Sequence, residues 1–270
     1  MLKKYVVAQA ASLKNFTDNA CAQASFCFRT LLKNKEIRVN GQKVSKDVLL
    51  KKGDEVCYYL TEAQLLRKAF QTVYEDENVL VVDKESGVNS EAVFSALQER
   101  GECYFIHRLD RNTAGLMIFA CSPKAEEELL SAFRTRKVEK IYHATVVGKM
   151  PSRHEILTAY LKKNEKTATV HVSSSPVGEK IITEYEVLSE GEDVSLLRVT
   201  LHTGKTHQIR AHLAFYGHPV VGDNKYGDES FNRARHATRQ KLVAKTLRLK
   251  ADGVLSYLSE RAFCSSHEAE

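Results

Sequence analysis

The chain contains no apolar run approaching the roughly 20 residues that a membrane-spanning helix requires, which argues against a helical membrane protein. Its first residues, MLKKYVVAQAASLKNF, are too polar for a secretory signal peptide. The six cysteines include no C-x-x-C pair, so neither a zinc ribbon nor a dithiol redox site is indicated. We therefore expect a cytoplasmic protein with reduced thiols and no membrane partner.

Signals of a metal or nucleotide site are also missing. His207 and His212 are spaced i, i+5, whereas a helical zinc pair is spaced i, i+4 with a Glu beside the first His. The sequence contains no Gly-rich phosphate loop and no internal repeat. It therefore predicts no metal and no cofactor.

The charge of the chain is concentrated at one end. The net charge is +6, and residues 1–60 hold 11 Lys and Arg against five Asp and Glu, an excess of six. The remaining 29 of the 40 basic residues are matched by 29 of the 34 acidic ones. A hydrophobic content of 43% supports a well-buried core in 270 residues. A basic segment on a neutral body predicts an anionic polymer as partner, and RNA or DNA first.

The basic end shows a characteristic order of elements. Two short helices are predicted between Phe16 and Leu32, followed by a strand in EIRVN, an Asn40-Gly41 turn and a closing strand in EVCYYL. Asn-Gly between two strands is the strongest short hairpin signal. This order, over about residues 13–60, resembles the ribosomal-protein S-four type of RNA-binding domain. A generic basic hairpin domain is the alternative.

The resemblance implies that residues 1–60 bind RNA and that residues 61–72 are a linker to a second domain. The basic side chains expected to contact RNA are Arg29, Lys33, Lys35 and Arg38.

The remaining residues, 73–270, predict a mixed domain. Apolar runs and alternating patterns indicate strands in VLVVDK, GLMIFACS, KIYHATVVG, IITEYEVL and VSLLRVTLH. Helices are predicted after Ser90, from Pro123 to about Arg134, and in THQIRAHLAFYG. Several of these strands follow one another with only short connections, which favours antiparallel pairing. We therefore expect a mainly antiparallel sheet with a few helices.

Two polar stretches interrupt this pattern. HRLDRNTAG sets Asp110 between Arg108 and Arg111. A solvated surface ion pair is the ordinary explanation, and a carboxylate kept ionised for chemistry on an anionic substrate is the alternative. In LHTGKTHQIRAHLAFYGHPVVGD, a predicted helix carries Arg210, and its first N–H groups are candidates for binding phosphate. The alternative is that Arg210 and the first-turn groups are ordinary polar residues of a helix.

Together these stretches resemble the RluA-type pseudouridine synthases. Five segments occur in the family's order over about residues 79–227, namely VVDKESG, HRLDRNTAG, KIYHA, TGKTHQIR and GHPVVGDNKYG. The sequence departs from the family pattern at Glu85, Ala114 and Lys205, and its tail lacks the usual closing motif. The resemblance implies an α+β chain, with a small basic α/β RNA-binding domain followed by a mixed, mainly antiparallel-sheet pseudouridine synthase domain.

The resemblance also implies roles for single residues. Asp110 is the catalytic carboxylate, acting as nucleophile or as base on the sugar, and Arg210 forms an ion pair with it. Tyr142 stacks on the target base, and Arg108 fills the gap left by the flipped uridine. Arg111, Lys84 and Lys205 are expected to meet RNA, although Lys84 has a second interpretation as support for the loop that carries Asp110.

The implied reaction is the isomerisation of uridine to pseudouridine in RNA, with large-subunit ribosomal RNA as the first expectation and transfer RNA as the alternative. A monomer is expected. A hydrolytic glycosylase would normally show two carboxylates, and the second has no evident candidate. A non-catalytic RNA-binding protein is the other hypothesis, and Asp110, Tyr142 and Arg210 are the residues that distinguish the two.

Overall fold

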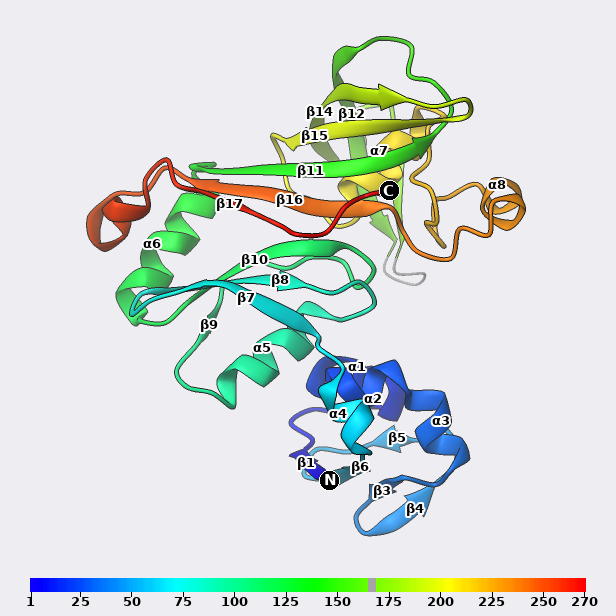
Figure 1. Cartoon of the computed structure of the whole chain (residues 1–270), viewed down its shortest axis with the longest axis vertical. Helices are drawn as coiled ribbons and strands as arrows, with labels where there is room; N and C mark the ends of the chain where they lie inside the picture. The colour runs from blue at the N-terminus through cyan, green and yellow to red at the C-terminus, as the bar shows by residue number, and fades with distance from the viewer. Residues whose placement is uncertain (165–168) are drawn as a thin grey trace.

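The computed structural model describes residues 1–164 and 169–270. Residues 1–60, here called the N-terminal unit, form a sheet in the order β1-β6-β3-β4, a β2-β5 pair and three helices (Figure 1). Their bounds are β1 Leu2–Val6, β2 Ala11–Ser12, α1 Leu13–Ala20, α2 Ala22–Phe26, α3 Phe28–Lys33, β3 Ile37–Val39, β4 Gln42–Val44, β5 Leu49–Leu50 and β6 Glu55–Tyr59.

The Asn40-Gly41 turn joins β3 to β4 as predicted. Both residues have a positive φ, 49° and 78°, which the tight hairpin turn of this type requires. The helical stretch differs from the prediction, because three short helices replace two. Ser12 begins α1 by accepting the N–H of Asn15 at 3.1 Å. The unit has its own hydrophobic cluster, which includes Leu13, Leu31, Ile37, Val56 and Tyr58.

The segment 61–72, expected to be a linker, contains regular structure. Helix α4 spans Glu62–Leu66, and strand β7, Phe70–Glu75, begins before the expected boundary. The reason is local, because Thr61 and Gln64 form a capping box in which each side chain binds the other's backbone N–H.

The remaining chain builds one large sheet in the order β13-β12-β14-β15-β11-β16-β10-β8-β7. Among the pairs described, only β10 and β16 run parallel, so the mainly antiparallel sheet is confirmed. The bounds are β8 Val79–Lys84, α5 Ser90–Gln98, β9 Tyr104–Phe105, β10 Ala114–Ala120, α6 Pro123–Arg134, β11 Val138–Val147, β12 His154–Asn164, β13 Thr169–Ser173, β14 Glu179–Glu190, β15 Val194–Leu201, α7 Gln208–Phe215, α8 Glu229–Ala234, β16 Leu242–Leu249, η1 Gly253–Leu258 and β17 Ala262–Cys264.

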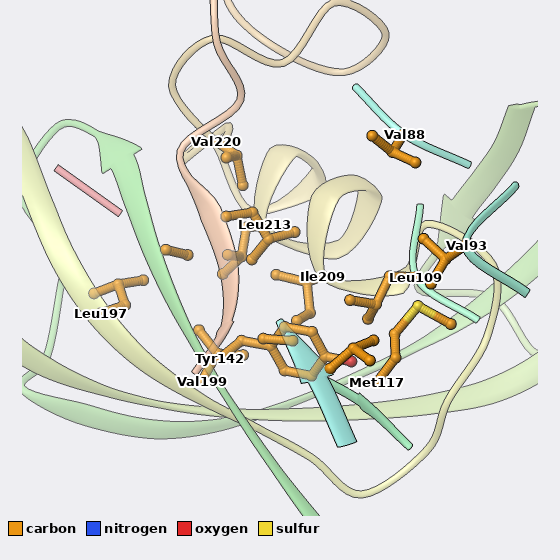
Figure 2. Packing of buried hydrophobic residues seen from close by; sticks show 14 of the residues in the cluster. Val88, Val93, Leu109, Met117, Tyr142, Leu197, Val199, Ile209, Leu213 and Val220 are labelled. Atoms are coloured by element: carbon orange, nitrogen blue, oxygen red, sulfur yellow. The ribbon is translucent and has the colours of Figure 1, made fainter. Parts of the chain in front are cut away.

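Strands β8 and β10 are buried on both faces, which explains their continuous apolar runs. Their side chains alternate between two clusters. One cluster, which also takes in residues of α5 and α7, contains Leu80, Val82, Met117 and Phe119, and Figure 2 shows part of it around Met117. The other, with residues of α6, contains Val79, Val81, Leu116 and Ile118. Full burial of each such side chain stabilises the fold by roughly 1.5–3 kcal/mol.

Gly115 permits the close approach of β10 to β16. Its φ is +114°, and a Cβ at this position would lie 2.4 Å from the carbonyl oxygen of Ala244. A glycine is therefore required where the HRLDRNTAG segment enters its strand.

The tail folds onto the large sheet. Strand β17 pairs with β16, and the following residues bind Asp83, which is 1% exposed. Ser265 Oγ donates to Asp83 Oδ1 at 2.7 Å, and the Ser266 N–H donates to Oδ2 at 2.8 Å. The tail thus holds the end of β8, one residue before Lys84.

Candidate active site

Asp110 lies in the irregular loop between β9 and β10, here called the catalytic loop (residues 106–113). Two clamps fix this loop. Ser90, the first residue of α5, donates its hydroxyl proton to the Leu109 carbonyl and accepts the Leu109 N–H, both at 2.9 Å. The Gly87 N–H donates to the Arg111 carbonyl at 2.8 Å. The backbone on both sides of Asp110 is therefore held by the β8–α5 connection.

Lys84 is the second part of this clamp, and the expectation that it contacts RNA is wrong. Its side chain is 0% exposed, and its ammonium donates to the carbonyls of Val88 at 2.8 Å, Glu85 at 3.0 Å and Arg111 at 3.2 Å. Burial lowers the pKa of Lys84 to about 7. The alternative interpretation, support for the catalytic loop, agrees with these contacts.

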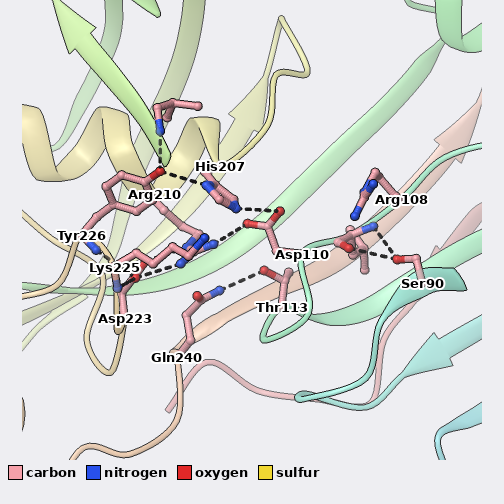
Figure 3. A network of polar contacts seen from close by, with 12 residues as sticks. Ser90, Arg108, Asp110, Thr113, His207, Arg210, Asp223, Lys225, Tyr226 and Gln240 are labelled. Atoms are coloured by element: carbon pink, nitrogen blue, oxygen red, sulfur yellow. Dashed lines mark hydrogen bonds and ion pairs between the residues drawn. The ribbon is translucent and has the colours of Figure 1, made fainter. Parts of the chain in front are cut away.

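Arg210 brings the two polar stretches together. From α7, its Nη1 donates to Asp110 Oδ2 at 2.8 Å, although the two residues are 100 positions apart in the chain. The other side of the guanidinium is bidentate to Asp223, with Nε–Oδ2 at 2.6 Å and Nη2–Oδ1 at 2.9 Å (Figure 3). Arg210 thus bridges two carboxylates, which leaves Oδ1 of Asp110 without a bond to it.

Burial makes this bridge a strong constraint. Arg210 and Asp223 are buried, whereas the side chain of Asp110 is 22% exposed. Burial opposes the charge of Arg210, but hydrogen bonding to Asp223 and the charges of both carboxylates raise its pKa. Burial likewise opposes the charge of Asp223. The Arg210 guanidinium outweighs this effect of burial and lowers the pKa of the Asp223 carboxyl. The charges of Arg210 and Asp223 therefore stabilise each other, and Asp110 lies at the exposed end of the bridge.

His207 faces the other oxygen of Asp110. It precedes α7 in the left-handed conformation, with a φ of 54°, which is uncommon for a residue other than glycine. The Tyr226 hydroxyl accepts the backbone N–H of Val170 at 2.8 Å and shares a hydrogen bond of 2.8 Å with His207 Nδ1, whose direction depends on the tautomer of the ring. Burial lowers the pKa of His207 and favours the neutral ring. Its Nε2 lies 3.9 Å from Asp110 Oδ1.

Tyr142 lies on β11, at the point where the pairing of β11 with β16 shifts register. Its ring belongs to the same hydrophobic cluster as Leu109 and Ile209, whose side chains lie close to it in Figure 2. Burial and the nearby charge of Asp110 raise the pKa of its hydroxyl, so the phenol stays neutral. The ring is placed beside the catalytic loop at the wall of the cavity described next.

A cavity of about 680 Å³ opens above Asp110. Its described lining contains seven basic residues and one acidic residue, Asp110 itself; the basic ones are Arg108, Arg111, Lys140, Lys163, Lys205, Arg210 and Lys225. Tyr142, His107, Phe133 and Leu201 add apolar surface. A site of this composition suits a substrate that carries both a planar base and phosphates.

The predicted RNA contacts lie in two places. Arg108 and Lys205 are at the cavity, with exposed side chains that pair with Glu91 and Glu179 respectively. The basic residues of the N-terminal unit are not brought to the cavity. Arg29, Lys33 and Lys35 are exposed on and after α3, and the Arg38 guanidinium lies 4.9 Å from the Tyr59 ring. Figure 1 places α3, β3 and β4 on the part of the unit that faces away from the large sheet.

Arg111 lines the cavity and is also held by the N-terminal unit. Its guanidinium pairs with Asp18 of the N-terminal unit and donates to Ser25 Oγ at 3.1 Å. The carboxylate of Asp18 comes from far earlier in the chain, and nothing in the HRLDRNTAG segment identifies it.

Sequence reasoning also assigned no role to Asp223, Tyr226 and His207. All three lie in two of the segments that carry the family resemblance, GHPVVGDNKYG and TGKTHQIR. The motifs therefore marked these positions but did not indicate what each side chain does. Within the described residues, no three His, Cys, Asp or Glu side chains gather as metal ligands. None of the described helices has the combined length and apolar character needed to cross a bilayer.

Buried histidines predict acid sensitivity of the fold. Burial lowers the pKa of His212 from 6.5 to about 4 and, together with Lys140, that of His107 to about 3. Both must bind protons on unfolding, so stability is complete above pH 6.5 and falls as the pH drops toward 4. The shift of His212 alone corresponds to roughly 3 kcal/mol. Asp223, whose pKa is lowered, contributes a separate loss only below about pH 4.

Urea unfolding at pH 7.5 and pH 5 measures this loss. His212→Gln, which cannot titrate, is expected to flatten the pH dependence, and His236→Gln, at an exposed position, is expected to leave it unchanged. If the free energy of unfolding changed equally between the two pH values in all three proteins, His212 would not be a source of the pH dependence.

The comparisons with known proteins agree with this geometry. The family model described as RNA pseudouridylate synthase matches residues 78–215, which include Asp110, Tyr142 and Arg210. The chain belongs to this family of RNA-modifying isomerases and is an RNA pseudouridine synthase. The RluA-type resemblance of the catalytic domain is confirmed, whereas the match does not cover residues 1–60, and their S-four type assignment stays a prediction.

Curated relatives narrow the similarity further. The chain is 30% identical to the ribosomal large subunit pseudouridine synthase C of Vibrio parahaemolyticus, over 77% of this chain and 73% of that protein. It is 35% identical to the ribosomal large subunit pseudouridine synthase D of Blochmanniella floridana, over 66% of this chain and 64% of that one. The solved structure of human RNA pseudouridylate synthase domain containing 1 aligns with a TM-score of 0.62 and 26% identity, covering 73% of this chain and 83% of the human one.

Proposed function

We propose that this synthase acts on large-subunit ribosomal RNA, with Asp110 as its catalytic carboxylate. The single observation that carries the assignment of Asp110 is its ion pair with Arg210 at 2.8 Å, at the wall of the basic cavity. The substrate class rests on the names of the relatives, which are ribosomal large subunit synthases. We place the enzyme in the cytoplasm, acting as a monomer.

The reaction requires no net gain or loss of atoms. The bond from C1′ of the ribose to N1 of uracil breaks, the ring turns, and a bond from C1′ to C5 forms. C5 loses its proton and N1 gains one. Asp110 acts through Oδ1, the oxygen that Arg210 leaves open, either as nucleophile or as base on the sugar. A glycosidase that activates water would need a second carboxylate, and Asp223, which shares Arg210 with Asp110, is buried in the bidentate bond with that arginine.

The target base must leave its stack to reach Asp110, because the carboxylate lies inside a cavity rather than on a flat surface. Tyr142 offers one face of its ring to the flipped uracil. Arg108, which is two-thirds exposed at the cavity, exchanges its pair with Glu91 for the vacated position in the RNA. Lys205 meets a phosphate at the same opening.

The N-terminal unit is proposed to be an S-four type RNA-binding domain. Its excess of six positive charges supports this, as do the exposed positions of Arg29, Lys33 and Lys35.

Salt dependence tests the N-terminal unit. Replacing Lys33 and Lys35 by Gln is expected to weaken binding and to lower the log–log salt slope by about 0.7–0.9 for each phosphate that is no longer neutralised. Lys124→Gln, an exposed change on α6, is the matched control and should leave the slope unchanged. An unaltered slope in the double variant would show that these lysines do not bind RNA phosphates.

The substrate is tested by mapping pseudouridine in total RNA from cells with and without the gene, complemented by wild type or by Asp110→Asn. We expect sites in large-subunit ribosomal RNA to disappear without the gene and to return only with wild type. Sites that vanish from transfer RNA instead would reassign the substrate. No change at any site in any RNA would contradict the proposal.

A further inference from the structure

The N-terminal unit is joined directly to the catalytic loop. Arg111, the residue after Asp110, uses its side chain to reach this unit, where it pairs with Asp18 and bonds to Ser25 Oγ at 3.1 Å. Its carbonyl oxygen accepts the Lys84 ammonium and the Gly87 N–H. One residue of the catalytic loop is therefore fixed to the β8–α5 connection by its main chain and to the N-terminal unit by its side chain.

Asp18 is well placed to receive this contact. The residue is 9% exposed, and its carboxylate accepts the Ser25 hydroxyl at 2.5 Å and pairs with Lys14 of the same helix as well as with Arg111. Such a carboxylate, with few places left for water, depends on its partners within the protein. Removal of its charge would leave Arg111 without the carboxylate that orients it.

Other contacts support the same docking. Asn89 Nδ2 donates to Asn19 Oδ1 at 2.8 Å, and Asn89 lies at the start of α5, next to the Ser90 that binds Leu109. At the other end of α5, Glu99 accepts Lys3 Nζ at 2.6 Å and the Tyr5 hydroxyl at 3.2 Å. Figure 1 shows α1 lying against α5. The unit therefore touches the structure that holds the catalytic loop at three separate points.

We propose that Asp18 is a positioning residue for catalysis, acting through Arg111, so that the N-terminal unit sets the rate of turnover as well as the affinity for RNA. The catalytic loop has no regular secondary structure around Asp110, so its geometry depends on individual contacts, among them those of Ser90, Gly87 and Arg111. A displacement of about 1 Å in a catalytic group costs on the order of 100-fold in rate, so the loss of one anchor is measurable. A simple tether would alter affinity alone.

The test compares the values of kcat and KM of full-length variants on two RNAs. One is a short hairpin that contains the target uridine and is too small to reach Lys33 and Lys35, and the other is a long fragment around the same site. Asp18→Asn is expected to lower kcat about tenfold on both RNAs with little change in KM. Asp18→Glu, which retains the charge, should restore most of the rate.

The matched control is the Lys33→Gln, Lys35→Gln double variant, which is expected to raise KM on the long RNA only. If it does not, the proposed RNA contact of these lysines fails while the kcat comparison still stands. Should Asp18→Asn unfold the unit, Ser25→Ala, which removes a neutral contact to both Asp18 and Arg111, provides the second comparison. Unchanged kcat in Asp18→Asn and in Ser25→Ala would overturn the proposal.

Discussion

Asp110→Asn is expected to abolish pseudouridine formation while the protein still folds and binds RNA. Asn has nearly the same volume and still accepts the Arg210 Nη1 hydrogen bond through its amide oxygen, so packing changes little. It lacks the negative charge, which makes it a poor nucleophile and a poor base, and turnover should fall by at least roughly 10³-fold. The measurement is tritium release from RNA labelled at C5 of uridine, in buffer with a chelator and no added nucleotide.

Asp252→Asn makes the same chemical change at an exposed position outside the cavity and should retain full activity. Wild-type turnover in Asp110→Asn would show that this carboxylate is not catalytic, and a non-catalytic RNA-binding role would then be the better account. Activity of the wild type that disappears with the chelator and returns with zinc would overturn the prediction that no metal is needed.

Arg210→Met is expected to remove activity and to destabilise the fold by about 3–5 kcal/mol, because it leaves the buried Asp223 without its bidentate partner. The loss of the Asp110 ion pair contributes less to this destabilisation, because water reaches the Asp110 carboxylate. Methionine retains much of the length of the arginine stem, so the loss reports the charge rather than an empty volume. Urea unfolding at pH 7.5 gives the free energy, and the same tritium assay gives the activity.

The double variant Arg210→Met, Asp223→Asn separates the two effects. Neutralising the stranded carboxylate should recover part of the stability, because a buried ion pair replaced on both sides costs far less than one broken from one side. Activity should not return, since Asp110 still lacks its cation. If the double variant is as unstable as Arg210→Met, Asp223 is not the source of the loss.

The sequence predicted those parts of the fold that depend on local pattern. β8 and β10 were found because both faces of each strand are buried, so their apolar runs are continuous. β1, with the sequence LKKYV, was missed because its side chains are exposed or half-buried and its polar residues hide the pattern. β12 was missed for a similar reason, since exposed residues dominate both of its ends.

The site shows the same division. Asp110, Tyr142 and Arg210 were predicted from motifs and do meet at one cavity. The sequence could not predict the contacts of the Lys84 and Arg111 side chains. A charged residue is expected to be exposed unless its partner is known, and the partners of these two are not evident from the sequence. Ser25, which binds Arg111, lies 86 residues earlier in the chain, and the carbonyls that surround Lys84 carry no sequence signal at all.

The strand order has a consequence for how the enzyme is made. β16 lies between β10 and β11, so two earlier groups of strands have no common partner until residues 242–249 exist. Asp110 precedes β10 of the first group and Arg210 follows β15 of the second, and β16 lies between these two groups in the sheet. We therefore expect both groups to keep an open sheet edge until β16 has been synthesised, at about 5–20 residues per second. A nascent chain interrupted before β16 would contain both Asp110 and Arg210 and still lack the strand that joins the two parts of the sheet.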